Sequence, residues 1–170
     1  MSDPLIITLM IEEEWQAYFT ELRNRFFPKH VNYLSAHITM LHHLPPDMQD
    51  LEEKLNLFSA RKSFDINISQ VKNIGNGVAF GIVSDELQRM HAEMQKVFEL
   101  YLIQQDRQKL WPHITVQNKV TAWKAQTTQM LLSESFKPFS VKATGLATWI
   151  YKKGPWEAAG KYYFEKEGVV

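Results

Sequence analysis

The stretch AHITM at residues 36–40 recurs as PHITV at residues 112–116, so the tripeptide His-Ile-Thr stands twice in one chain. Successive side chains of a β-strand point to opposite faces. The His and the Thr of each copy therefore share one face, while the Ile and the residue after the Thr take the other. Each copy predicts a strand that is anchored in a core by its apolar face and presents an imidazole and a hydroxyl group on the opposite face.

Chance does not account for this pair of tripeptides. A randomly ordered chain of this composition contains about 0.02 His-Ile-Thr tripeptides, which is the false-positive estimate that any motif needs. Two copies with matching apolar neighbours indicate that the two strands act together. They would place two acid–base groups and two hydroxyl donors around one pocket.

The composition is that of an ordinary globular protein, with 45% hydrophobic and 22% charged residues. A length of 170 residues suits one domain with a substantial core. Nineteen basic side chains balance nineteen acidic ones, so no overall charge attracts duplex nucleic acid or an anionic membrane. A ligand that bears phosphate must then be held locally. The absence of cysteine excludes disulfides, thiolate nucleophiles and cysteine zinc sites.

An apolar run near the N-terminus covers only residues 5–11 (LIITLMI). This run is too short to span a membrane, and no positive charge precedes it as in a signal peptide. It predicts a buried strand instead. We therefore expect a cytoplasmic protein that does not contact a membrane. We also expect it to be a monomer.

The predicted elements follow the same order in both halves of the chain, and the turn-forming pair Asn76-Gly77 separates the halves. Each half contains a strand, a helix, a His-Ile-Thr strand, a second helix and a further strand. The other elements expected in the first half are a strand over residues 5–11, a helix over about 12–27, a helix capped by Asp47 and a strand over 64–69. Those of the second half are a strand over residues 78–83, a helix capped by Ser84, a helix over about 121–133, an extended segment over 139–151 and a last strand over 161–165.

This repetition predicts an α+β fold in a single domain over residues 1–170. Two pseudo-symmetric lobes, at about residues 1–75 and 76–170, would carry antiparallel sheets with helices outside. The sequence does not decide whether the two lobes exchange their terminal strands. A two-fold arrangement would set the two His-Ile-Thr strands opposite each other across a central cleft, so that both copies form one active site.

The two predicted strands carry groups that suit attack at a phosphodiester. One imidazole can remove a proton from water or a hydroxyl group, while the other protonates the departing oxygen. Two threonine hydroxyl groups add neutral donors for the non-bridging phosphate oxygens. This chemistry requires no metal ion, and the sequence lacks the acidic cluster of a two-metal nuclease. We therefore expect no cofactor.

The paired His-hydrophobic-Thr motifs, about 76 residues apart, resemble those of the 2H phosphoesterase superfamily, and within it the bacterial and archaeal 2′–5′ RNA ligase-like branch. The resemblance covers most of the chain, including a C-terminal hairpin with a Gly-Pro-Trp sequence. It implies a bilobal fold whose motifs face each other in a cleft. It also implies an enzyme that opens 2′,3′-cyclic phosphates or related phosphodiesters, with His37, Thr39, His113 and Thr115 as the catalytic set.

Further residues along the two strands are candidates for binding substrate. If the strands continue in register, His43 shares a face with His37, and Gln117 and Lys119 follow His113 on its face. Lys119 could then meet a phosphate. The alternative is that His43 and Lys119 lie in solvent at the ends of their strands.

Aromatic residues near the C-terminus form a second group of candidates. Tyr151 and Trp156 could stack on a nucleobase, with Lys152 and Lys153 adding local positive charge. For Trp149, packing against the sheet is the preferred interpretation.

The leading hypothesis is a metal-independent phosphodiesterase that acts on a nucleotide or RNA end bearing a cyclic phosphate. A non-catalytic nucleotide- or phosphate-binding module on the same fold and 2′–5′ RNA ligase activity are the alternatives. A zinc site built from His37, His42, His43 and His113 is disfavoured, because adjacent residues of a strand point to opposite faces. The physiological substrate and the assignment of base and acid to the two histidines stay open.

Overall fold

The structure is a computed structural model that describes residues 2–166. No helix in this range is long and apolar enough to cross a membrane. The helices and strands, in chain order, are β1 (Leu5–Ile11), α1 (Glu13–Phe26), β2 (Ile38–Leu44), α2 (Leu51–Ser59), β3 (Phe64–Asn73), β4 (Val78–Val83), α3 (Asp85–Val97), β5 (His113–Gln117), α4 (Ala122–Ser133), β6 (Phe139–Tyr151) and β7 (Trp156–Tyr163).

These strands form one antiparallel sheet in the order β2-β1-β6-β3-β4-β5, with β7 paired to β6 outside this path. The long strand β6 joins the two halves, because its first residues pair with β3 and its later residues pair with β1. The antiparallel α+β class is confirmed. The strands of the two halves are nevertheless continuous in one sheet, and the third strand of each half lies beside the first strand of the other half.

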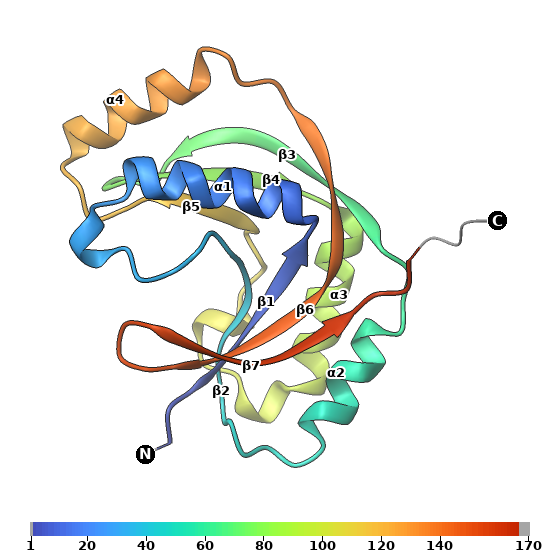
Figure 1. Ribbon diagram of the computed structural model, residues 1–170. Helices are drawn as coiled ribbons and strands as arrows, with labels where there is room; N and C mark the ends of the chain where they lie inside the picture. The colour runs from blue at the N-terminus through green and yellow to red at the C-terminus, as the bar shows by residue number, and fades with distance from the viewer. Residues whose placement is uncertain (1, 167–170) are drawn as a thin grey trace.

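The sheet curls until its two ends meet. Strands β2 and β5 stand at opposite ends of the strand order, yet they contact each other. Figure 1 shows this curl, with β3 and β4 on one side of the molecule and β1, β6 and β7 on the other. Both His-Ile-Thr segments therefore belong to edge strands that approach each other across the open side of the sheet.

Helix α1 packs an aromatic stripe against strands that lie far away in the sequence. Phe19 is fully buried, and its ring centroid lies 5.2 Å from that of Phe80 in β4. Trp15, four residues earlier and on the same helix face, stacks on Phe139 at 4.5 Å. A helix of the first half thus covers strands of the second half, which places its buried side beside β5.

Capping side chains explain where two of the helices begin. Ser84 precedes α3 and Thr121 precedes α4, and the hydroxyl group of each accepts a hydrogen bond from the backbone N–H three residues later, at 3.2 Å. The prediction that Asp47 caps a helix is wrong. Helix α2 begins at Leu51, because turns occupy the preceding residues and Asp50 has a left-handed φ of 62° that cannot continue a helix.

Candidate active site

The two His-Ile-Thr segments hold equivalent positions in the sheet. His37 immediately precedes β2, and His113 is the first residue of β5. The isoleucines of both motifs are each 1% exposed, whereas both histidines and both threonines are half-buried. The predicted alternation of faces is therefore confirmed within the motifs, and Thr39 pairs with Thr8 of β1 while Thr115 pairs with Ala79 of β4.

Both imidazole rings are held by the same local hydrogen bond. Nδ1 of His37 lies 2.8 Å from the carbonyl oxygen of Ser35, and Nδ1 of His113 lies 2.8 Å from that of Trp111. A carbonyl oxygen only accepts, so Nδ1 carries the proton in the neutral form of each ring. This bond leaves Nε2 of both rings as the nitrogen that can take or give a proton.

Each imidazole also contacts an indole ring. The centroid of His37 lies 4.6 Å from that of Trp156 at an interplanar angle of 50°, and His113 stacks on Trp111 at 4.1 Å and 15°. The ammonium group of Lys72 lies 4.7 Å from the Trp111 ring centroid in a cation–π contact. Trp156 was predicted as a site residue, whereas Trp111 and Lys72 were not.

The surroundings make both imidazoles weak bases. Burial lowers the pKa of His37 to about 4; the Ser35 carbonyl opposes this shift, and positive charges on Arg23, His113 and His42 add to it. Burial also lowers the pKa of His113 from its usual value. The contact between the edge strands β2 and β5 sets the two motifs side by side, and a positive charge on His113 is one of the causes that lower the pKa of His37. Both rings are neutral at pH 7 in the free protein.

Arg23 on α1 is a buried cation that joins the helix to the second motif. Its guanidinium group donates to the backbone carbonyl of Thr115 at 3.1 Å and to Oδ1 of Asn32 at 2.8 Å, and it lies 4.1 Å from the centroid of the Phe27 ring. Burial lowers the pKa of Arg23 to about 10, so the group stays charged near neutral pH. It therefore supplies fixed positive charge close to His37.

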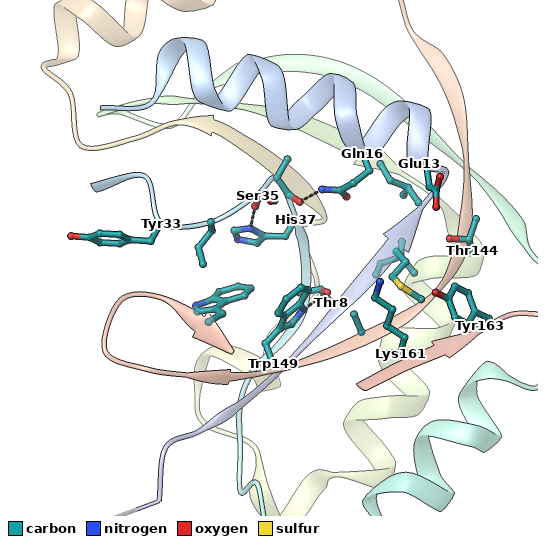
Figure 2. Close-up of a pocket in the computed structure, with 17 residues that line it drawn as sticks. Thr8, Glu13, Gln16, Tyr33, Ser35, His37, Thr144, Trp149, Lys161 and Tyr163 are labelled. Carbon is teal, nitrogen blue, oxygen red and sulfur yellow. Dashed lines mark hydrogen bonds between the residues drawn. The ribbon is translucent and has the colours of Figure 1, made fainter. Parts of the chain in front are cut away.

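A cavity of about 410 Å³ opens beside His37, between α1, the segment 33–37 and strands β1, β6 and β7. Trp149 and Trp156 line it, and the indole N–H of Trp149 donates to Oγ1 of Thr8 at 2.9 Å, which fixes the ring. Figure 2 shows the cavity extending from His37 and Trp149 towards the ends of Glu13 and Lys161. Its volume suits a small ligand such as a nucleoside.

Three of the predicted binding residues, His43, Gln117 and Lys119, do not share the face of the motif histidines as predicted. The register of β2 shifts between its pairs with Thr8 and Ile7, so His43 does not keep the face of the motif, and its side chain is exposed. A shift in β5 turns Gln117 inward, where its amide donates to Oγ1 of Thr128 at 2.8 Å. Lys119 lies beyond the end of β5, exposed and with a φ of 60°.

The C-terminal hairpin brings one predicted aromatic residue to the cavity and leaves the other outside. β7 begins at Trp156, earlier than predicted, because Trp156 pairs with Tyr151 directly across the hairpin. Trp156 reaches His37, whereas the Tyr151 side chain is 38% exposed and does not line the cavity. Trp149 lines the cavity rather than packing only against the sheet.

His42 is a third imidazole in this region, and from the sequence it was considered only as a ligand of the disfavoured zinc site. Its Nδ1 lies 2.7 Å from Oδ1 of Asp106, a carboxylate that is 2% exposed. The same carboxylate accepts from the backbone N–H groups of His42, at 3.0 and 2.9 Å, and of His43, at 3.1 Å. A positive charge on His42 would lower the pKa of both His37 and His113.

The described part of the chain contains no group of three or more His, Cys, Asp or Glu side chains arranged to hold a metal ion. The four histidines of the disfavoured zinc hypothesis do not converge on one point. His42 points its Nδ1 at Asp106, and His43 is exposed.

Comparisons with known proteins match nearly the whole chain. A sequence model of the 2′-5′ RNA ligase superfamily matches residues 11–155. The structure of TT0787 from Thermus thermophilus is similar with a TM-score of 0.64 and 17% identity, covering 97% of this chain and 100% of that one. E. coli LigT complexed with 3′-AMP gives a TM-score of 0.58 and 12% identity, covering 96% and 99% of the two chains. No curated protein matches the sequence.

The family match includes both motif strands, the helices between them and the start of the C-terminal hairpin. The structural likeness, at these low identities, shows a fold shared with LigT and TT0787. Both findings agree with the family that the paired motifs predict. The chain belongs to the 2′-5′ RNA ligase superfamily of 2H phosphoesterases.

Proposed function

We propose that this protein is a metal-independent phosphodiesterase that opens a 2′,3′-cyclic phosphate on a nucleotide or an RNA end. Membership of the superfamily supports phosphodiesterase or ligase-type chemistry. The matched imidazole pair carries the proposal. His37 and His113 stand at edge strands that contact each other, and each has Nδ1 bound to a carbonyl oxygen and Nε2 left for proton transfer.

In the proposed reaction, Nε2 of a neutral imidazole accepts a proton from water while the water oxygen forms a bond to phosphorus. The bond between phosphorus and one ribose oxygen breaks, and the second imidazole, which is protonated, delivers its proton to that oxygen. The product is a phosphomonoester beside a free ribose hydroxyl group. Hydroxyl groups of Thr39 and Thr115 would donate to the non-bridging oxygens as negative charge develops there.

The proton for the departing oxygen would arrive with the substrate. Burial keeps His37 and His113 neutral in the free protein at pH 7. A phosphodiester anion between the two rings favours the charged form of imidazole and raises both pKa values. One ring can then hold a proton while the other stays neutral, which is the charge state that the reaction requires.

The cavity beside His37 would hold the nucleoside part of the substrate. Its two indole rings suit stacking with a nucleobase, and His37, the imidazole that would meet the phosphate, is one of its lining residues. LigT of E. coli has been crystallised with 3′-AMP, ATP and NADP+, which supports a nucleotide as the ligand class for this fold. No broad basic surface is needed to recognise such a small ligand.

We expect His37→Ala and His113→Ala each to lower kcat on 2′,3′-cyclic nucleotides by about 10²- to 10⁴-fold, because each removes a group that transfers a proton. Phosphorus NMR with a chelator present measures the product and its regiochemistry. His30→Ala is the matched control, because His30 is exposed and precedes the motif on the same segment.

Unchanged turnover in either motif variant would show that the two imidazoles do not perform the reaction. Tight nucleotide binding by the wild type without any product would favour the binding-module alternative. Adding an oligonucleotide with a free 5′-hydroxyl group tests the ligase alternative, in which that hydroxyl replaces water as the attacking group.

A further inference from the structure

The cavity ends, away from His37, in a group of polar side chains that the proposed reaction does not use. Figure 2 shows Glu13, Thr144, Lys161 and Tyr163 at this end, while His37 lies at the other. Glu13 is the first residue of α1, Thr144 belongs to β6, and Lys161 and Tyr163 belong to β7. Three elements therefore contribute hydrogen-bonding groups to one end of one cavity.

Glu13 and Lys161 stand out because they carry opposite charges and do not pair with each other. Both side chains are exposed at this end of the cavity, and within residues 2–166 neither forms an ion pair or a hydrogen bond with another residue. They are also the cavity's only lining residues with a side chain that is charged at neutral pH. A ligand that offers a hydrogen-bond acceptor beside two donors can bind the ammonium group and the carboxylate at once, in place of water.

The remaining walls restrict what that ligand can be. Trp149 cannot turn freely because its N–H is bound to Thr8, and Trp156 lies 6.2 Å from it, between centroids, and against His37. A flat heterocycle can stack on these indoles. With its sugar phosphate at His37, the heterocycle would direct its outer edge towards Glu13 and Lys161.

We infer that the cavity is a guanine-selective base site, an inference that rests on the proposed function. Guanine presents two adjacent donors, N1–H and the 2-amino group, beside the acceptor O6. A carboxylate accepts from both donors, and an ammonium group donates to O6. Adenine offers the carboxylate only its 6-amino group, and the pyrimidines are shorter and stack less well.

The test compares kcat/KM for the 2′,3′-cyclic phosphates of guanosine, inosine, adenosine, cytidine and uridine. We expect guanosine to be preferred over adenosine by about 10- to 100-fold, the range of one good bidentate contact. Inosine, which lacks only the 2-amino group, should fall between them. Equal kcat/KM for all five substrates would overturn the base assignment and leave the proposed reaction intact.

Two variants localise the preference. Glu13→Gln should reduce or reverse the preference for guanine, because a side-chain amide pairs well with adenine, and Lys161→Met should weaken guanosine binding by about tenfold. The matched controls Glu14→Gln and Lys137→Met change the same residue types outside the cavity and should keep the preference. A guanine preference that survives Glu13→Gln unchanged would overturn the role of the carboxylate.

Calorimetry separates this inference from the proposed reaction. If the protein hydrolyses no cyclic nucleotide, 3′-GMP should still bind more tightly than 3′-AMP to the wild type, and Glu13→Gln should remove the difference. Binding of 3′-GMP that is no tighter than that of 3′-AMP would overturn the inference, whatever the outcome for hydrolysis.

Discussion

At the scale of the residue, the two motif histidines share their hydrogen bonds but differ in their surroundings. Both rings are oriented by a carbonyl oxygen two residues earlier in the chain. His37, however, borders the cavity and the buried charge of Arg23, whereas His113 stacks on a partly exposed indole near Lys72. The two motifs therefore differ in the residues that surround their rings: burial lowers the pKa of both, while the charge of Arg23 adds to this shift at His37 and that of Lys72 adds to it at His113.

These pKa values predict an acidic optimum for kcat/KM. The proposed reaction needs one protonated and one neutral imidazole, so kcat/KM should rise through the pKa of His37, about 4, and fall through that of His113, below the 6.5 of an ordinary imidazole. Initial rates from about pH 3.5 to 8.5 measure this bell-shaped profile. Its two apparent pKa values describe the two coupled histidines together, not one histidine each.

The profile of kcat should lie at higher pH than that of kcat/KM, because a bound phosphate anion raises the pKa of both rings. Coincident profiles, or a kcat/KM maximum above pH 7, would contradict the low pKa values of the free protein.

At the scale of the element, the two motif strands show what the sequence can and cannot reveal. The alternation of faces over His-Ile-Thr depends on local geometry, so the pattern predicted it correctly. The register shifts that follow in β2 and β5 depend on pairing with β1 and β4, and they turned Gln117 inward and left His43 in solvent. No local pattern predicts such a shift, and for the same reason the contact between His42 and Asp106, 64 residues apart, was not predicted.

Asp106→Asn should destabilise the edge strand β2. The buried carboxylate accepts hydrogen bonds from two backbone N–H groups and from the ring of His42. An amide offers one acceptor oxygen and sets its own N–H groups against these donors, so the free energy of unfolding should fall by about 2–3 kcal/mol. Denaturant unfolding measures the loss.

Asp47→Asn is the control for this variant, because Asp47 is an exposed aspartate on the loop that follows β2. Equal stability of Asp106→Asn and the wild type would show that the carboxylate does not hold the strand.

At the scale of the whole molecule, the two halves of the chain are interlocked rather than adjacent. Strands β3 and β6 lie beside the first strands of the opposite halves, and α1 packs on β5. The repeated order of elements predicted the pseudo-symmetry and left this exchange open. Whether the halves exchange strands depends on long-range packing, such as the contact of Phe19 with Phe80. No short segment of the sequence specifies such a contact. Neither half can then form its part of the site without the other.

Arg23→Met should test this link between the halves. It removes the hydrogen bond from α1 to the carbonyl of Thr115 and leaves that acceptor without its partner, so the free energy of unfolding should fall by about 2 kcal/mol. Loss of the positive charge should also raise the pKa of His37, which would move the acid limb of kcat/KM to higher pH.

Arg25→Met is the matched control, because Arg25 is an exposed arginine on the same helix. An acid limb that moves equally in both variants, or in neither, would contradict the role of Arg23 in setting the pKa of His37.

The contact of each motif histidine with its own indole gives the protein a pair of built-in optical reporters. Protonated imidazole quenches indole fluorescence at contact distance, and Trp156 and Trp111 lie 4.6 and 4.1 Å from the rings of His37 and His113. In a Trp111→Phe protein the acid-dependent emission change would follow His37, and in a Trp156→Phe protein it would follow His113. Fluorescence as a function of pH therefore measures the titration of each ring separately and without substrate, whereas a pH–rate profile reports only the two pKa values of the pair.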